Sequence, residues 1–207
     1  MSLRFSLGAL APTALLVGCG SAPLAHVETS VPDAVAVRGA VEEYSLVGDN
    51  VAVEADVRAS AAYTVHFPNS KGTLKFAPDA HDASSFELDI DVTVATSSLQ
   101  IVADIARDKF LHAGDYPTAR FATRSLRPGL EAGSYTLFGD LTLHGKTLSL
   151  SMPAHVVADD CHVSIDVEFG VDRQAFGVVA TGVLEDVVSN TVVVRIKTSV
   201  LRQSCKG

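Results

Sequence analysis

The sequence is poor in several residue types that mark particular classes of protein. Its 207 residues include no Trp, two Met and three Cys, and aromatic residues make up 6% of the chain. Lys and Arg number 16 against 24 Asp and Glu, which gives a formal net charge of -8, and basic residues never form a run longer than two. Because phosphate binding needs a concentrated positive face, this composition disfavours a nucleic-acid partner.

Long apolar runs are also missing. The first run, from Phe5 to Val17, follows the single charge of Arg4. At about 1.5 Å per residue, its length falls well short of the roughly 30 Å hydrocarbon core of a bilayer. A positive start, a short apolar middle and small residues afterwards are typical of a secretory signal.

The end of this signal resembles the bacterial lipobox, in Leu16-Val17-Gly18-Cys19. The resemblance predicts a signal peptide over residues 1–18, lipidation of Cys19 and a flexible tether over residues 19–40. It implies a lipoprotein of the bacterial cell envelope that faces the periplasm. Gly20 replaces the Asp that often retains lipoproteins on the inner membrane, so by that analogy the outer membrane is expected. The alternative is an ordinary signal peptide that happens to contain a cysteine.

Two cysteines remain for the exported part of the chain, Cys161 and Cys205. In an oxidising compartment such a pair is expected to form a disulfide, which would tie the carboxyl end to the start of a strand. Two free thiols are the alternative.

Alternation of apolar and polar residues dominates residues 41–207, the expected folded domain. It is strict over residues 86–94 and 163–171, where acids occupy one face, and weaker over residues 51–57, 63–67, 74–76 and 135–143. Period two with turn residues between the segments predicts an antiparallel all-β barrel or sandwich of about eight to ten strands. One stretch has helical spacing and predicts a short helix over residues 103–112, with Gly114 near its C-cap.

Catalytic signatures are missing as well. The seven His residues lack the close spacing on one face of an element that a zinc motif needs. The best candidate group of metal ligands is Asp159–His162 with His81, Asp82 and His112, and its members are far apart in the sequence. No nucleophile elbow, phosphate-binding loop or dinucleotide fingerprint occurs. The sequence therefore predicts neither an enzyme nor a metal site.

Three landmarks occur in order along the chain. The first is Arg107–Leu111 followed by Tyr116–Phe121, and the second is the hairpin Gly139–Gly145 with its Gly-x-Leu-Thr-x-His-Gly pattern. The third is an aromatic, Arg and Phe-Gly group, with members Phe169, Arg173 and Phe176-Gly177. In this order the landmarks resemble the YceI-like family of periplasmic proteins.

The resemblance implies an extended antiparallel lipocalin-like β-barrel of about eight strands with one short helix. It further implies an interior that holds a long apolar, lipid-like small molecule, such as an isoprenoid quinone or a polyprenyl or fatty chain, for carriage, storage or stress response. An eight-stranded barrel can either fill its interior with side chains or keep room for one ligand, so a close-packed interior without a ligand is an alternative. A further alternative is a ligand-free scaffold that binds a protein through its acidic surface. A homodimer is also possible.

The candidate ligand-binding residues are the inward-facing apolar residues and a few polar groups near them. They are Val65, Phe67, Phe86, Leu88, Ile90, Phe110, Tyr116, Phe121, Tyr135, Phe169, Arg173 and Phe176. Parity with Phe169 places Arg173 on the apolar side, where a guanidinium needs a partner. A ligand head group, a carboxylate at the barrel mouth, or a strand end that emerges into water would each satisfy it.

Overall fold

The computed structural model describes residues 41–77, 80 and 83–205. Residues 1–40, with Cys19 and the expected tether, lie outside this range, as do His81 and Asp82. The strands are β1 (Glu42–Val47), β2 (Val51–Arg58), β3 (Ala62–His66), β4 (Lys71–Phe76), β5 (Ser85–Asp91), β6 (Thr96–Ser97), β7 (Thr118–Pro128), β8 (Ser134–Leu143), β9 (Lys146–Ala158), β10 (His162–Asp172) and β11 (Thr191–Leu201). The helices are α1 (Gln100–Ile105) and α2 (Val183–Val187), and a π-helical turn, Ala106–Phe110, extends α1.

The alternation seen in the sequence becomes alternation of burial. Along β10, Val163, Ile165 and Val167 are buried, whereas the acids Asp166 and Glu168 on the other face are exposed. On the outer face Arg195 of β11 bridges Asp56 of β2 and Glu168 of β10. The all-β prediction is confirmed, with one face of each strand in the core and the other in water.

All eleven strands belong to one antiparallel sheet, in the order β1-β4-β5-β7-β8-β9-β10-β11-β2-β3-β6. The count exceeds the eight expected because three long strands are interrupted. Short irregular segments separate β1 from β2, β3 from β4 and β5 from β6, including the turns Gly48–Asn50 and Val92–Val94. The pairing resumes beyond the first gap with a shift of two residues, since Glu54 pairs with His66 whereas Leu46 pairs with Gly72. The outermost strands of the sheet are therefore joined through the chain, and the sheet curls around a common interior.

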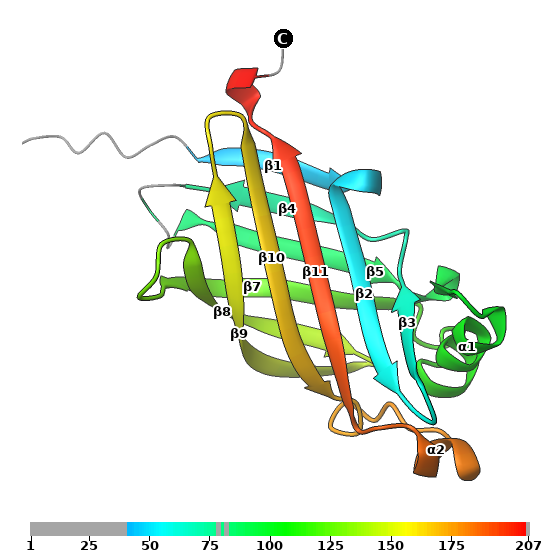
Figure 1. Ribbon diagram of the computed structural model, residues 1–207. Coiled ribbons are helices and arrows are strands. Elements are labelled where there is room, and N and C mark those ends of the chain that lie inside the picture. The colour runs from blue at the N-terminus through cyan, green and yellow to red at the C-terminus, as the bar shows by residue number, and fades with distance from the viewer. Residues whose placement is uncertain (1–40, 78–79, 81–82, 206–207) are drawn as a thin grey trace, which may run out of the picture. The chain divides into compact units, whose positions relative to one another are not determined.

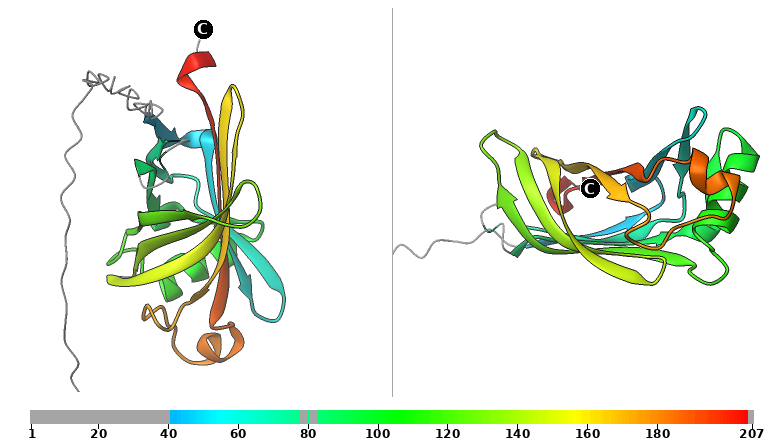
Figure 2. Two further views of the ribbon diagram at one scale, coloured as in Figure 1. Left: turned by 90° about the vertical axis from the view of Figure 1, so that its left-hand side faces the viewer. Right: turned by 90° about the horizontal axis from the view of Figure 1, so that it is seen from below.

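Two groups of strands cross each other in this curled sheet. In Figure 1, β2, β10 and β11 run steeply across the front, and β4, β5 and β7 run behind them in a different direction. The close approach of β4 to β5 depends on Gly72, where a Cβ atom would lie 2.0 Å from the Glu87 carbonyl oxygen. Figure 2 shows that α1 and α2 lie together at one end of the barrel.

The helices differ from the expectation in extent and number. The helix predicted over residues 103–112 begins earlier, at Gln100, and its second half is the π-helical turn that ends at Phe110. The left-handed residue after it is His112, at φ 44°, rather than Gly114. The short helix α2 was not expected, because five residues carry too little periodicity to reveal a helix.

The predicted disulfide is confirmed. Cys161, just before β10, is bonded to Cys205, which follows β11, and their Cα atoms lie 5.5 Å apart. Near it, the Arg202 guanidinium pairs with Glu42 of β1 at 2.5 Å. Both described ends of the chain are thus fastened at the end of the barrel opposite the helices.

Candidate binding cavity

The barrel interior has two unlike halves. Away from the helices, large apolar side chains close-pack, among them Leu46, Leu74 and Met152. Toward the helices the interior opens into a cavity of about 390 Å³, lined by residues from β2, β3, β5, β7, β8, β10 and β11 and from both helices. Among the described residues that form its wall, only Ser60, Tyr63 and Arg173 are polar.

Small inward-facing residues create this space. Ala55 of β2 and Ala119 of β7 occupy wall positions at which a larger side chain would fill the interior. Gly139 of the neighbouring strand β8 makes room for the ring of the wall residue Phe121, because a Cβ atom at Gly139 would lie 2.6 Å from Phe121 Cζ. The mixture of small and large inward residues therefore leaves a cavity rather than a filled barrel.

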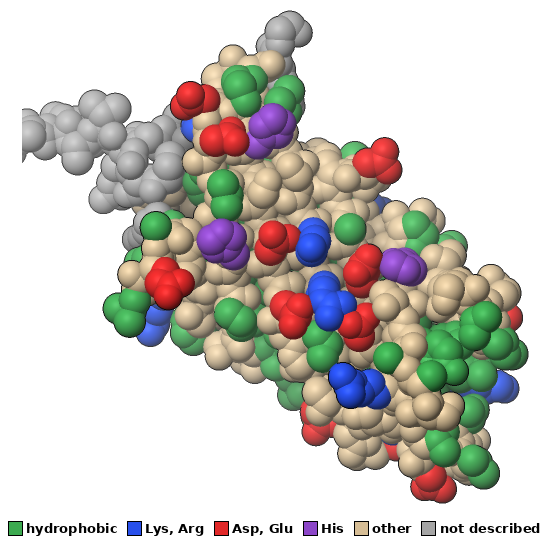
Figure 3. Space-filling view, viewed as in Figure 1, with side chains coloured by type: hydrophobic (Ala, Val, Ile, Leu, Met, Phe, Trp, Pro, Cys, Tyr) green, Lys and Arg blue, Asp and Glu red, His purple; other side chains and the backbone are tan. Residues whose placement is uncertain are grey.

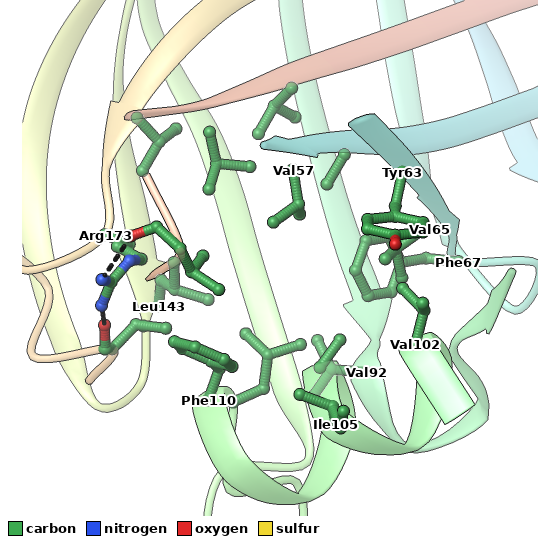
Figure 4. Close-up of a pocket in the computed structure, with 18 of the residues that line it drawn as sticks. Val57, Tyr63, Val65, Phe67, Val92, Val102, Ile105, Phe110, Leu143 and Arg173 are labelled. Atoms are coloured by element: carbon green, nitrogen blue, oxygen red, sulfur yellow. Dashed lines mark hydrogen bonds between the residues drawn. The ribbon is translucent and has the colours of Figure 1, made fainter. Parts of the chain in front are cut away.

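The helical end contributes the rest of the wall. Val102, Ile105 and Phe110 project from α1 and its π-helical extension into the cavity, as Figure 4 shows. From the other side, α2 and the residue after it add Leu184, Val187 and Val188.

Arg173 is the one charged residue in the cavity wall, and only 3% of it is exposed. It follows the last residue of β10, and its guanidinium lies 5.1 Å from the centroid of the Phe110 ring. Its Nη1 donates to both carboxylate oxygens of Glu185, at 2.8 and 3.0 Å, and to the Val178 carbonyl at 2.9 Å. Nε donates to Ser189 O, and Nη2 donates to Val188 O and, at 3.3 Å, to Glu185 O; bonds to lining residues are dashed in Figure 4.

These bonds decide between the explanations left open for Arg173. Its partner is a carboxylate at the barrel mouth, and the strand end does not emerge into water. Hydrogen bonds from Arg173, the Ala180 amide and Gln174 lower the pKa of Glu185 to about 2, so the carboxylate is charged at neutral pH. The positive charge is thus matched inside the protein, and all three guanidinium nitrogens are occupied.

Seven of the twelve candidate residues line the cavity. They are Val65, Phe67, Ile90, Phe110, Phe121, Phe169 and Arg173. The other five lie elsewhere, which corrects their assignment to the cavity wall.

These five residues were assigned to the wall because alternation along a strand predicts which side chains point inward. It does not predict how far along the barrel axis each inward side chain lies. Phe86 and Leu88 point inward in the packed half, where Phe86 borders only a small void of about 20 Å³. Phe176 is fully buried outside the cavity, and Tyr135 lies partly buried near the opposite end of β8. Tyr116 is on the outside, its ring 4.1 Å from that of His144.

The wall also contains residues that sequence reasoning missed. Tyr63 of β3 is the clearest, since the alternation Tyr63-Val65-Phe67 already placed it on the inward face. Figure 4 shows its ring beside Val65, at the side of the cavity where Val102 lies. Within the described part of the chain, its hydroxyl has no hydrogen-bond partner, so it can donate to a ligand at this place.

Two histidines meet outside the cavity. His112 Nδ1 and His144 Nε2 are 3.1 Å apart, and desolvation, reinforced by the nearby His112 and Lys146, lowers the pKa of His144. Among residues 41–77, 80 and 83–205, no three His, Cys, Asp or Glu side chains come together where they could hold a metal ion. Asp159 instead accepts bonds from the Cys161 and His162 amides and so shapes the turn before β10.

No helix of the described residues is long and apolar enough to span a lipid bilayer.

A curled antiparallel sheet with an apolar cavity behind two short helices defines a barrel of the lipocalin-like class. The chain belongs to the YceI family, because the YceI-like domain matches residues 44–200. Both the expected fold and the expected family are thereby confirmed. No curated protein sequence matches the chain significantly.

Solved structures give the same fold. BcnA of Burkholderia cenocepacia superimposes with a TM-score of 0.67 at 24% identity, covering 72% of this chain and 95% of its own. A polyisoprenoid binding domain from Saccharophagus degradans, implicated in plant cell wall breakdown, gives 0.60 at 16% identity, with 77% and 98% covered. The YceI protein of Campylobacter jejuni gives 0.56 at 16% identity, with 66% and 83% covered.

Proposed function

We propose that this protein binds one end of a neutral isoprenoid or fatty-chain molecule inside the barrel, for carriage, storage or stress response rather than catalysis. The observation that carries the proposal is the cavity wall, which is apolar except for Ser60, Tyr63 and Arg173. Apolar surface of this kind favours a ligand that water excludes.

The ligand's charge follows from Arg173. A fatty acid or a polyprenyl phosphate would bring an anion into the cavity, where the only cation is already bonded to Glu185. Burying an unpaired charge is costly, so we expect a neutral head group. The Tyr63 hydroxyl suits a single acceptor such as the carbonyl of an isoprenoid quinone or a fatty amide.

The size of the cavity limits how much of the ligand is enclosed. A cavity of 150 Å³ holds a benzene molecule, so 390 Å³ has room for about 16 non-hydrogen atoms. This corresponds to roughly three isoprene units, and the rest of a longer chain must leave the barrel between the helices.

A cavity-filling variant tests the proposal. Ala55→Phe puts a ring into the cavity, whereas Ala52→Phe puts the same ring on the outer face of β2 as a matched control. Ubiquinone analogues and fatty amides with short chains should raise the melting temperature of the wild type and of Ala52→Phe, and leave Ala55→Phe unchanged. Native mass spectrometry of the protein from its own host should show a bound neutral lipid in the same two proteins. An equal response of all three proteins, or none at all, contradicts the proposal.

We further propose that the barrel is a lipoprotein of the bacterial envelope, attached through Cys19 to the outer membrane and facing the periplasm. The support is the lipobox-like Leu16–Cys19 and the absence of Asp at position 20. A Cys19→Ser chain should leave the membrane fraction, and a variant that stays there would contradict the anchor.

A further inference from the structure

The cavity mouth carries large apolar side chains that nothing in the described chain covers. Leu99 and Ile101 at the start of α1 are 51% and 63% exposed, and Val183 and Val187 of α2 are 75% and 47% exposed. We call these four residues the apolar rim. Figure 3 shows hydrophobic side chains gathered at this end of the molecule.

The rim is continuous with the cavity. Leu99, Ile101 and Val187 are exposed and yet also line the cavity wall. An apolar surface therefore runs from the outside of the helices into the barrel. A water-insoluble chain that moves along this surface would stay in contact with apolar side chains throughout.

We propose that the apolar rim docks onto the surface of a zwitterionic lipid bilayer, so that a lipid-like ligand passes between bilayer and cavity without crossing water. This inference rests on the proposed ligand-binding function. Short helices that bury a few apolar side chains at the depth of the head groups are a known form of interfacial binding.

Charge around the rim points to a bilayer without net charge. Arg107 is paired with Asp104 and Asp108 at 2.9 and 2.8 Å, and Glu185 is paired with Arg173. The helices therefore offer no cluster of free cations for anionic lipids, and the net charge of -8 repels an anionic surface. Apolar contact must supply the binding energy.

The length of the amino-terminal segment permits this orientation under the proposed anchor. The first strand begins at Glu42, at the end of the barrel opposite the rim, and β11 spans the barrel with eleven residues, about 36 Å. The stretch 19–40, between Cys19 and the barrel, can extend to roughly 75 Å. The rim can thus face the same bilayer that holds Cys19.

Single Trp reporters test the proposal in the full chain, since the protein has no Trp of its own. Val183→Trp places the reporter on the rim, and Leu130→Trp places it in the fully exposed β7–β8 loop, at the other end of β8 from the helices. With phosphatidylcholine vesicles whose acyl chains carry bromine, the Val183→Trp emission should shift to the blue and lose roughly half its intensity, as expected at the head-group depth. The emission of Leu130→Trp should stay unchanged.

Two further variants separate docking from other causes. Adding Ile101→Glu and Val187→Glu to the Val183→Trp chain should abolish quenching while the melting curve stays cooperative, because both sites are exposed. Adding Ala55→Phe instead blocks the cavity and should leave the quenching intact, so that failure of ligand binding and failure of docking are distinguished.

Three results would overturn the proposal: a Val183→Trp emission that vesicles leave unchanged, equal quenching of both reporters, or quenching only by vesicles rich in anionic lipid. If vesicles leave the Val183→Trp emission unchanged, a protein partner replaces the bilayer as the candidate that covers the apolar rim.

Discussion

Thr198 is a buried residue whose hydroxyl has no hydrogen-bond partner within the described part of the chain. It points inward from β11, between the cavity residue Ile196 and the packed residue Val200. An unpaired buried hydroxyl costs about 1–3 kcal/mol. Thr198 is therefore a weak point in an otherwise apolar interior.

Thr198→Val replaces the hydroxyl by a methyl group of the same shape. We expect the variant to be about 1 kcal/mol more stable, which corresponds to a rise in melting temperature of about 2–4 °C. Thr191→Val, at the exposed start of the same strand, is the control and should change little. A loss of stability in Thr198→Val would show that a buried water or ligand satisfies the hydroxyl in solution.

At the scale of elements, α2 depends on one ion pair. The helix has five residues and no side-chain cap, so it cannot persist on its own. Glu185 attaches it to the barrel through Arg173, the Ala180 amide and Gln174. The mouth of the cavity is therefore held in place from within the wall.

Glu185→Gln should loosen this attachment, because it leaves the buried Arg173 guanidinium without its counter-charge. Amides of residues 181–188 should exchange hydrogen faster and the melting temperature should fall, whereas Asp186→Asn, the exposed neighbour, should behave as wild type.

The same loosening of α2 should occur in the wild-type protein in acid. The pKa of Glu185 in the folded protein, about 2, lies below the ordinary glutamate value of 4.5. This stabilisation is therefore present above pH 4.5 and is lost as the pH falls toward 2. Unchanged exchange in Glu185→Gln would mean that packing alone holds α2.

The disulfide acts on the last strand. Cys161 and Cys205 are separated by 44 positions that include β10 and β11. In the chain-entropy description, a loop of this length contributes about 4 kcal/mol. Cys161→Ser with Cys205→Ser should lower the free energy of unfolding by about 2–4 kcal/mol in urea, with quinone-analogue binding preserved because the cavity lies at the other end. The dithiothreitol-reduced wild type is the matched control, and a doubly substituted protein as stable as the oxidised wild type would contradict the expectation.

For the whole molecule, the strand pattern predicted most of the fold. Alternation in residues 86–94 and 163–171 gave the all-β class, and the order of landmarks gave the family. The strand count was wrong because three breaks, between β1 and β2, β3 and β4, and β5 and β6, each divide one long strand into two. The alternation of apolar and polar residues predicts which face of the sheet each side chain occupies. Where a strand bends depends instead on contacts with residues far away in the sequence.

The cavity was less predictable. Its wall depends on the level of each residue along the barrel. Leu88 and Ile90 are two positions apart on the same face of β5, yet only Ile90 lines the cavity. The partner of Arg173 comes from Val183–Val187, a segment without any strong period. Volume left over between elements is a property of the assembled barrel and has no local signature.

Acid should destabilise the whole barrel. Hydrogen bonds lower the pKa of several carboxyl groups. The pKa of Glu42 is lowered mostly by a hydrogen bond from Arg202 and less by one from Tyr44. The pKa of Asp56 is lowered mostly by a hydrogen bond from Thr64 and less by one from Arg195. Because the unfolded chain then binds protons more readily than the native one, stability should fall as the pH drops below about 4.5. Urea unfolding between about pH 7 and 3 measures this. Glu42→Gln should weaken the acid dependence, whereas Glu43→Gln, on its exposed neighbour, should retain it; identical curves would exclude Glu42 as a contributor.

Both described chain ends leave the barrel at the disulfide end, away from the helices. A label, a fusion partner or a solid support attached through the carboxyl end would therefore leave the opening unobstructed. Under the proposed ligand-binding function, this arrangement would let an immobilised protein present its opening to a sample of apolar molecules.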